Sequence, residues 1–222
     1  MILSYEEIEL LSQPILQAFW RTEEPPLGPM EIYRFAKFLH LNVYETKLSD
    51  DDSILGLTTY APTQLELCRN GKRVILRIPG DTILLSDSLR KHPKRLRFTL
   101  AHECAHQILH RYESLETQGE LYAAYRPGLQ TADDWNEWQA NALGAALLMP
   151  AALIRRSMRA FRCETLISYG GVMTQQDHHT MRSIADSLQV SRRALEIRLR
   201  HLGYLQERPY EEYKDPLEVW NE

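Results

Sequence analysis

Two histidines stand four residues apart in a stretch without glycine or internal proline, a pattern that constrains the fold of the 222-residue chain more than any other feature. Pro93 lies at the start of this stretch, as is typical of the first turn of a helix, so we predict a helix from there to about Arg111. Residues four apart on a helix share a face, with a rise of about 6 Å between them. His102 and His106 can therefore each direct an imidazole nitrogen at a single metal ion.

Glu103 directly follows the first histidine and lies about 100° around the helix from it. There its carboxylate would flank a metal without binding it, which suits a general base for a water molecule. The same segment carries many apolar residues and is predicted to be buried: Phe98, Leu100, Ala101, Ala105, Ile108 and Leu109. Buried histidines need polar partners, which favours a metal over the alternative that they are ordinary core or surface histidines.

A catalytic zinc keeps three protein ligands and one open position, so one more ligand is expected. His110 lies on the same predicted helix but about 12 Å along its axis from His102, too far for both to reach one ion. The longer pattern HExxHxxGxxH fails as well, because Leu109 and Tyr112 occupy its glycine and last histidine positions. The third ligand is therefore expected from another segment.

Glu137 is the best candidate for this ligand. It lies on a helix predicted from Asp133 to Leu148, and small residues on that helix permit close packing against the histidine helix: Ala140, Gly144 and Ala145. Asn141, one turn further along, could hold the second nitrogen of a ligand histidine. The alternative is that Glu137 is an ordinary exposed acid, which would leave Asp133 or Asp134 as the ligand.

These residues belong to two longer motifs. The first reads Arg97-Phe98-Thr99-Leu100-Ala101-His102-Glu103-Cys104-Ala105-His106, and the second reads Glu137-Trp138-Gln139-Ala140-Asn141-Ala142, followed by Leu148-Met149-Pro150. In this order they resemble the ImmA/IrrE metallopeptidases, over roughly residues 29–150. The resemblance implies that His102, His106 and Glu137 are zinc ligands and that Glu103 is the general base. Two packing positions depart from the family pattern, since Ala105 replaces a glycine and Leu143 an aromatic residue.

Strand-forming residues dominate the region before the histidine helix. The predicted strands are Ile54–Tyr60, Gln64–Cys68, Arg73–Ile78 and Thr82–Leu85. Asn70-Gly71 is a strong hairpin turn between the second and third of them. One of the last two strands could lie at a sheet edge and hold the backbone of a peptide substrate by strand addition. An oxyanion donor could come from a tyrosine of the next segment, Tyr112, Tyr122 or Tyr125.

Helices are predicted at the N-terminus. Ser4 and Glu7 form a capping box for a helix to about Trp20, within which Pro14 is expected to cause a kink or break. A second helix is predicted from about Met30 to Leu39. The fold class is therefore α+β: a small, twisted, mostly antiparallel sheet packed on the HExxH helix, with a helical C-terminal module.

An arginine-rich segment with helix-turn-helix spacing makes up this module, over about Thr180–Leu202. Five residues are expected to face inward: Ala185, Leu188, Val190, Leu195 and Leu199. Ser191 is expected to cap the second helix, and Gln189 stands where such turns usually have glycine. The segment could read DNA, but packing or docking of a partner protein is favoured, so DNA binding is expected to be weak.

Composition excludes several classes of protein. The formal net charge of −4 gives no general attraction to nucleic acid or to an anionic membrane. Cys68, Cys104 and Cys163 form no CxxC pair, which suits a reducing compartment; we expect buried thiols, with a regulatory role for Cys68 or Cys163 as the alternative. Neither a secretory signal nor an apolar stretch of about 20 residues is found. We expect a cytoplasmic protein with no membrane association.

The expected organisation is a zinc peptidase domain over residues 1–161, a helix-turn-helix-like module over 162–205 and an acidic tail over 206–222. The expected function is that of an intracellular endopeptidase with Zn²⁺ as its cofactor. The resemblance implies a helix-turn-helix transcriptional repressor as the substrate, whose cleavage would derepress stress-response or mobile-element genes. The alternatives are a DNA-binding regulator with a vestigial peptidase site and a toxin–antitoxin-type protein that binds its partner.

Overall fold

The computed structural model describes residues 3–21, 28–69, 71–111 and 132–213, with only the backbone at 68–69 and 132–133. The chain divides into two compact units, Met1–Pro150 and Ala151–Glu222. Helix α6 (Ala151–Ala160) therefore belongs to the second unit, although the sequence analysis places the domain boundary after residue 161. The predicted α+β class is confirmed, with helices and small sheets in each unit. No helix in the described part of the chain is long and apolar enough to cross a membrane.

Helix α1 (Tyr5–Trp20) opens the first unit. Its predicted capping box is present, since the Ser4 side chain accepts from the Glu7 amide while the Glu7 carboxylate accepts from the Ser4 amide. Pro14 lies within the helix without breaking it. The ring of Tyr5 packs edge-on against Trp138, which attaches α1 to helix α5 (Ala132–Leu148).

The first unit contains a three-stranded sheet in the order β1 (Asn42–Thr46), β5 (Thr82–Ser86) and β2 (Gly56–Thr59). Strand β1 pairs with β5 in parallel, from Asn42 opposite Thr82 onward, and β2 pairs with β5 in antiparallel fashion. The sheet is therefore mixed, where a mostly antiparallel one was predicted. Strand β5 is central, so the prediction that Thr82–Leu85 could be an edge strand is wrong.

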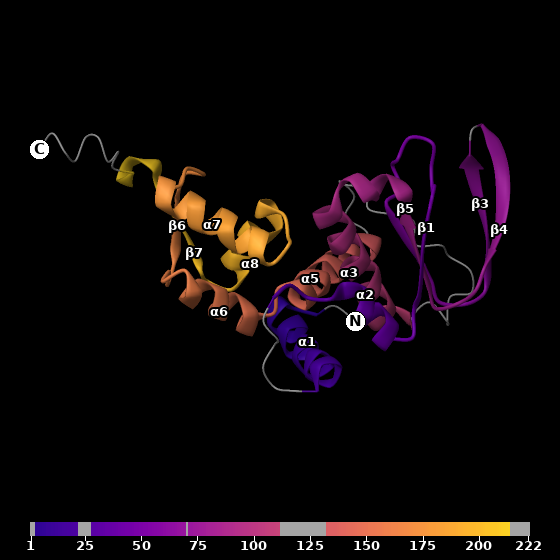
Figure 1. Ribbon diagram of the computed structural model, residues 1–222, viewed down its shortest axis with the longest axis horizontal. Helices are drawn as coiled ribbons and strands as arrows, with labels where there is room; N and C mark the ends of the chain where they lie inside the picture. Colours follow the sequence, from indigo (N-terminus) through magenta and orange to yellow (C-terminus); the bar gives the residue numbers. More distant parts are fainter. Residues whose placement is uncertain (1–2, 22–27, 70, 112–131, 214–222) are drawn as a thin grey trace, which may run out of the picture. The chain divides into compact units, whose positions relative to one another are not determined.

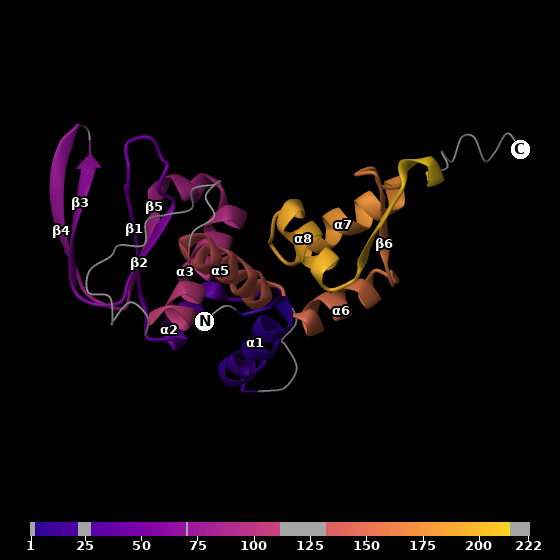
Figure 2. The same ribbon diagram turned by 180° about the vertical axis from the view of Figure 1, so that it is seen from behind.

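The predicted hairpin is confirmed: β3 (Thr63–Arg69) and β4 (Lys72–Ile78) pair in antiparallel fashion around Gly71. It forms a sheet of its own, which packs on the three-stranded sheet through a small apolar core. That core consists of Leu48, Leu57, Leu65, Leu67, Ile78 and Leu84, with Ile54 and Leu76 at its margin. The hairpin thus lies beyond the three-stranded sheet as seen from the helices (Figure 2).

Helix α3 (Pro93–Leu109) follows a short 3-10 helix, η1 (Asp87–Lys91), and begins at its proline as predicted. It packs against β2 and β5 on one side and against α5 on the other, while α2 (Ile32–Phe38) contacts both α3 and β1 (Figure 1). Because α3 is buried between a sheet and a second helix, polar side chains on it are shielded from bulk water. Three of the four predicted site residues lie on this helix: His102, Glu103 and His106.

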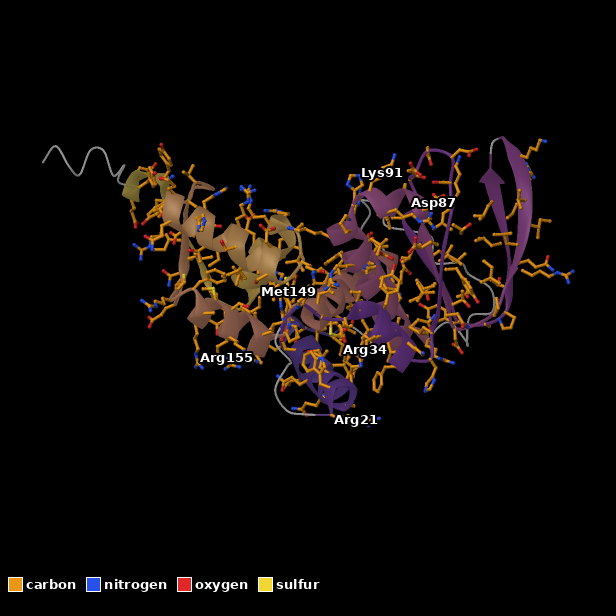
Figure 3. All side chains as sticks on the ribbon, viewed as in Figure 1. Arg21, Arg34, Asp87, Lys91, Met149 and Arg155 are labelled. Atoms are coloured by element: carbon orange, nitrogen blue, oxygen red, sulfur yellow. The ribbon has the colours of Figure 1, made fainter. Side chains whose placement is uncertain are left out.

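Besides α6, the second unit contains two strands and two further α-helices in its described residues: β6 (Leu166–Tyr169), α7 (Gln175–Ser187), α8 (Arg192–His201) and β7 (Leu205–Arg208). Strands β6 and β7 pair in parallel, a pairing that the sequence analysis did not predict. The 3-10 helix η2 (Tyr210–Glu212) follows β7, so the first part of the segment assigned to an acidic tail is regular structure. Arg155 points outward from α6 (Figure 3), whereas the preceding residue, Ile154, is buried.

Helices α7 and α8 occupy the predicted helix-turn-helix segment. All five residues expected to face inward are buried: Ala185, Leu188, Val190, Leu195 and Leu199. The Ser191 side chain accepts from the Ala194 amide and so caps α8, as expected. Gln189 has a φ of +53°, so it takes the left-handed conformation that glycine usually supplies in such a turn.

Candidate metal centre

The two motif histidines lie on the same face of α3 with their Nε2 atoms 3.0 Å apart. Both side chains are largely buried, with His102 9% and His106 3% exposed. Their rings meet nearly edge to face, at an interplanar angle of 82°. The two Nε2 atoms therefore point at one common position, as the helical spacing predicts.

Glu137 completes this group from α5. Its Oε2 lies 3.2 Å from His102 Nε2 and its Oε1 lies 3.2 Å from His106 Nε2. One ligand atom from each of the three residues lies within 4.8 Å of the others, so a single metal ion could be held by all three. Among the described side chains no other histidine, cysteine or carboxylate joins this group, and Asp134, named above as an alternative ligand, is outside it.

Close packing of α5 on α3 brings the carboxylate into reach. Gly144 lies against the backbone of the first ligand residue, and a Cβ at this position would be 3.1 Å from the His102 amide nitrogen. Ala140 is fully buried one turn earlier. The predicted role of the small residues on α5 therefore has a physical basis, because any larger side chain at Gly144 would separate the two helices.

A comparison with protein families agrees with this geometry. Residues 68–200, more than half of the chain, match the family of M78 peptidases described as the IrrE N-terminal-like domain. The chain belongs to this family. The match includes α3 and α5 and continues through α7 into α8, whereas the resemblance noted in the sequence ended near Pro150. A comparison with proteins of curated function gives no match.

Glu103 of this M78 peptidase is buried beside the three residues of the metal centre, on the side of α3 that faces β2. Gly56 of β2 lies directly against it: a Cβ at Gly56 would be 2.5 Å from Glu103 Oε1 and 2.7 Å from Thr99 Cγ2. Burial raises the pKa of Glu103 to about 7, although the nearby His102 opposes the rise. A carboxyl with such a pKa can both take and return a proton near neutral pH.

Charges within the group are strongly coupled. Burial by itself would raise the pKa of Glu137, but its contacts with His102 and His106 hold that pKa well below the usual range. Burial lowers the pKa of His106, and the neighbouring His102 adds to this effect. Burial also lowers the pKa of His102, but the interactions of this side chain with Glu137 and Glu103 outweigh burial and raise its pKa overall. Glu137 is therefore a carboxylate at neutral pH, as a metal ligand must be.

The donor set fits a metal that accepts nitrogen and oxygen ligands. Two imidazole nitrogens and one carboxylate oxygen form a three-ligand set known for catalytic zinc sites. The Nδ1 atom of His102 is buried and makes no hydrogen bond within the described residues. Asn141 nevertheless lies close enough to raise the pKa of His102, which agrees with the predicted position of this amide near a ligand histidine.

Sequence reasoning missed three residues around the centre. Gln107 donates from Nε2 to Thr58 Oγ1 at 2.6 Å and to the Thr59 carbonyl at 3.1 Å, which ties β2 to α3. Gly56 makes the close approach to Glu103 described above, and a glycine inside a predicted strand is a known signal for such an approach. His110 was rejected as a ligand, and its actual contact is with His106.

Several other candidates are not placed at the centre. Cys104 is fully buried, and burial raises the pKa of its thiol, so it behaves as a small apolar residue. Cys163 lies in the second unit, where its Sγ contacts the Thr165 carbonyl at 3.5 Å. The side chain of Cys68 and the three candidate oxyanion donors lie outside the described residues: Tyr112, Tyr122 and Tyr125.

Proposed function

We propose that this M78 peptidase is a zinc-dependent endopeptidase that hydrolyses a peptide bond within a partner protein. The observation that carries the proposal is the convergence of His102, His106 and Glu137 on one position beside the buried Glu103. Membership of the family supports the peptidase activity. A purely structural zinc site has four protein ligands and needs no base, whereas three ligands and an adjacent carboxyl are typical of a catalytic site.

In this proposal His102, His106 and Glu137 hold the metal, and Glu103 handles the proton. A zinc ion, when bound, would polarise the scissile carbonyl as a Lewis acid and make water a better nucleophile. Glu103 would accept the proton of the attacking water and deliver it to the nitrogen of the leaving amine. Burial, which in the metal-free chain raises the pKa of Glu103 to about 7, favours the return of this proton to the leaving amine.

Strand β2 is the best candidate to hold the substrate backbone. It pairs with β5 along one edge, and no strand of the described residues pairs with its other edge. It also runs along α3, with Gly56 at Glu103 and Thr58 at Gln107. An extended peptide added to this edge would pass the proposed catalytic residue. This proposal replaces β5, which is central in the sheet, as the substrate strand.

For the substrate we propose a helix-turn-helix transcriptional repressor, whose cleavage would release stress-response or mobile-element genes. The proposal comes from the resemblance to ImmA/IrrE metallopeptidases, to which the M78 match adds weight. The helix-turn-helix segment of this chain is then a docking module. A protein partner fits it better than DNA does, because its arginines are engaged within the module.

The arginine contacts show why. Glu196 Oε1 accepts from Arg193 and from Arg200 at 3.0 Å each. Arg192 contacts His178 Nε2 at 2.6 Å, and Arg198 is only 3% exposed. Phosphate binding would compete with these contacts, which disfavours the alternative of a DNA-binding regulator. A toxin–antitoxin-type binding protein would share the docking surface but would not need Glu103.

The test compares the zinc-loaded wild-type chain with Glu103→Gln. Both are incubated with a peptide library made from a digested proteome, and new termini are identified by mass spectrometry. Any helix-turn-helix repressor found to be encoded beside this protein is tested as an intact substrate in parallel. We expect cleavage by the wild type and none by Glu103→Gln, with equal zinc content in both. Equal cleavage by the variant would exclude Glu103 as the base, and zinc-independent cleavage would exclude the proposed centre.

A further inference from the structure

His110 makes a contact that the proposed mechanism does not use. Its Nδ1 lies 3.0 Å from the Nδ1 of His106, at the opposite end of the imidazole from the metal centre. The residue ends α3 as its C-cap and is only 2% exposed. Two neutral imidazoles at this distance share one hydrogen bond, in which one nitrogen must donate and the other must accept.

The direction of this hydrogen bond follows from the position of the metal centre. The Nε2 of His106 faces Glu137 Oε1 at 3.2 Å, so Nε2 is the atom available to a metal. A metal-binding nitrogen needs its lone pair, and a neutral imidazole then carries its proton on the other nitrogen. His106 therefore donates from Nδ1, and His110 accepts at Nδ1 and keeps its own proton on Nε2.

Resting on the proposed metal centre, the geometry points to His110 as a positioning residue, which fixes the tautomer and ring orientation of His106. It would not be a ligand itself, because its accepting nitrogen is occupied by the hydrogen bond to His106. The other ligand histidine has a different neighbour, since the Asn141 side chain lies beside His102. The hydrogen bond that His106 donates to His110 would hold the His106 ring in place before the metal arrives, and its loss would weaken metal binding.

Zinc affinity of the purified full-length chain tests this role. Removal of such an outer partner typically lowers metal affinity by about 10–100-fold. We expect this loss in His110→Phe, which keeps an aromatic ring but has no acceptor. His110→Asn should restore most of the affinity, because the amide Oδ1 lies where the imidazole Nδ1 was. His110→Gln should not, because its amide lies one bond further out.

A competition titration with a chromogenic zinc chelator gives these affinities, and circular dichroism of the metal-free variants controls for folding. His92→Phe is the matched control, since it makes the same replacement at the exposed N-cap of the same helix and should bind zinc as the wild type does. Unchanged affinity in His110→Phe would overturn the inference. So would equal affinities in His110→Asn and His110→Gln.

A spectroscopic measurement on the wild type needs no variant and decides the matter if His110→Phe does not fold. Long-range proton–nitrogen correlation spectra of the zinc-loaded chain report which nitrogen of each histidine carries a proton. We expect the proton on Nδ1 of His106 and on Nε2 of His110, and a proton on Nδ1 of His110 would contradict the inference. A wild-type chain that takes up no zinc would refute the metal centre itself, and His110's role with it, whereas normal uptake with the opposite tautomers would refute only the role of His110.

Discussion

Gly56 on β2 lies so close to Glu103 on α3 that a single added methyl group would be 2.5 Å from the carboxylate Oε1. The strand backbone thus forms one wall around the proposed base. Neither residue is near the other in sequence, and they meet because β2 packs along α3. The atoms nearest to such a methyl group belong to Glu103 and Thr99, not to the metal ligands. A substitution at Gly56 can therefore test the proposed base separately from the metal ligands.

Gly56→Ala should displace the Glu103 carboxylate and leave the metal ligands in place. Side-chain atoms meet the new methyl group, so the carboxylate can move aside, but a shift of about 1 Å can cost roughly 100-fold in rate. We expect a loss of this size in peptide cleavage with zinc content unchanged. Gly71→Ala is the control, because its φ of +70° makes alanine strained while no atom lies within 4 Å of the new Cβ. Gly71→Ala should lower stability and retain activity; normal cleavage by Gly56→Ala would mean that Glu103 is not the base.

Glu137→Ala should remove the third metal ligand. The expected fall in zinc affinity exceeds the loss of roughly 100-fold that removal of an outer partner can cause. Asp134→Ala, one turn earlier on the same helix, should bind zinc normally, because Asp134 lies outside the cluster. Elemental analysis after dialysis measures both. Zinc retained by Glu137→Ala and lost by Asp134→Ala would reverse the assignment.

Gly144→Ala should disturb the packing of α5 on α3. A Cβ there would be 3.1 Å from the His102 amide nitrogen and 3.2 Å from its Cα, and backbone atoms cannot swing aside. Overpacking typically costs about 1–3 kcal/mol, while alanine gains about 1 kcal/mol over glycine in a helix. We expect a small loss in the free energy of unfolding and weaker zinc binding.

Gly144→Val gives the graded comparison. Its larger, β-branched side chain should lower both quantities further, because the separation between α3 and α5 must increase more. Urea denaturation of the metal-free chain and a chelator titration measure the two effects. Zinc affinity that stays constant across glycine, alanine and valine would show that close helix contact is not needed for the centre.

Local signals in the sequence predicted the elements that depend on neighbours along the chain. The capping box of Ser4 and Glu7, the hairpin at Gly71 and the shared face of His102 and His106 each involve residues within one turn of helix or one tight turn. Their geometry follows from backbone periodicity alone. The prediction of Glu137 as the carboxylate ligand also required the second sequence motif, because helical spacing alone did not exclude Asp133 and Asp134.

Features that depend on distant segments were missed. Strand β1 pairs with β5 through residues as far apart as Asn42 and Thr82, and β6 pairs with β7 across two helices. Neither strand pair has a local turn that fixes its partner, and four-residue strands such as Leu205–Arg208 have too few positions to show an alternating pattern. The spacing of four between His106 and His110 allows their contact, but the sequence alone excluded His110 as a ligand and did not show that it pairs with His106.

The last prediction concerns DNA. In the wild type the arginines of α8 are engaged, so duplex binding should be weak and independent of sequence. Glu196→Gln removes the carboxylate that Arg193 and Arg200 share. Each arginine that becomes available can contact a phosphate, and each phosphate contact displaces a counterion from DNA. This variant should therefore bind duplex more tightly and with a steeper dependence on salt.

Glu211→Gln is the control for this prediction. It makes the same change of charge at an exposed position on η2 and should behave as the wild type does. Fluorescence anisotropy with a labelled duplex at several salt concentrations measures both slopes. A sequence-selective, salt-sensitive complex of the wild type at nanomolar concentration would overturn the docking role, because it would show that the arginines reach DNA despite their contacts within the module.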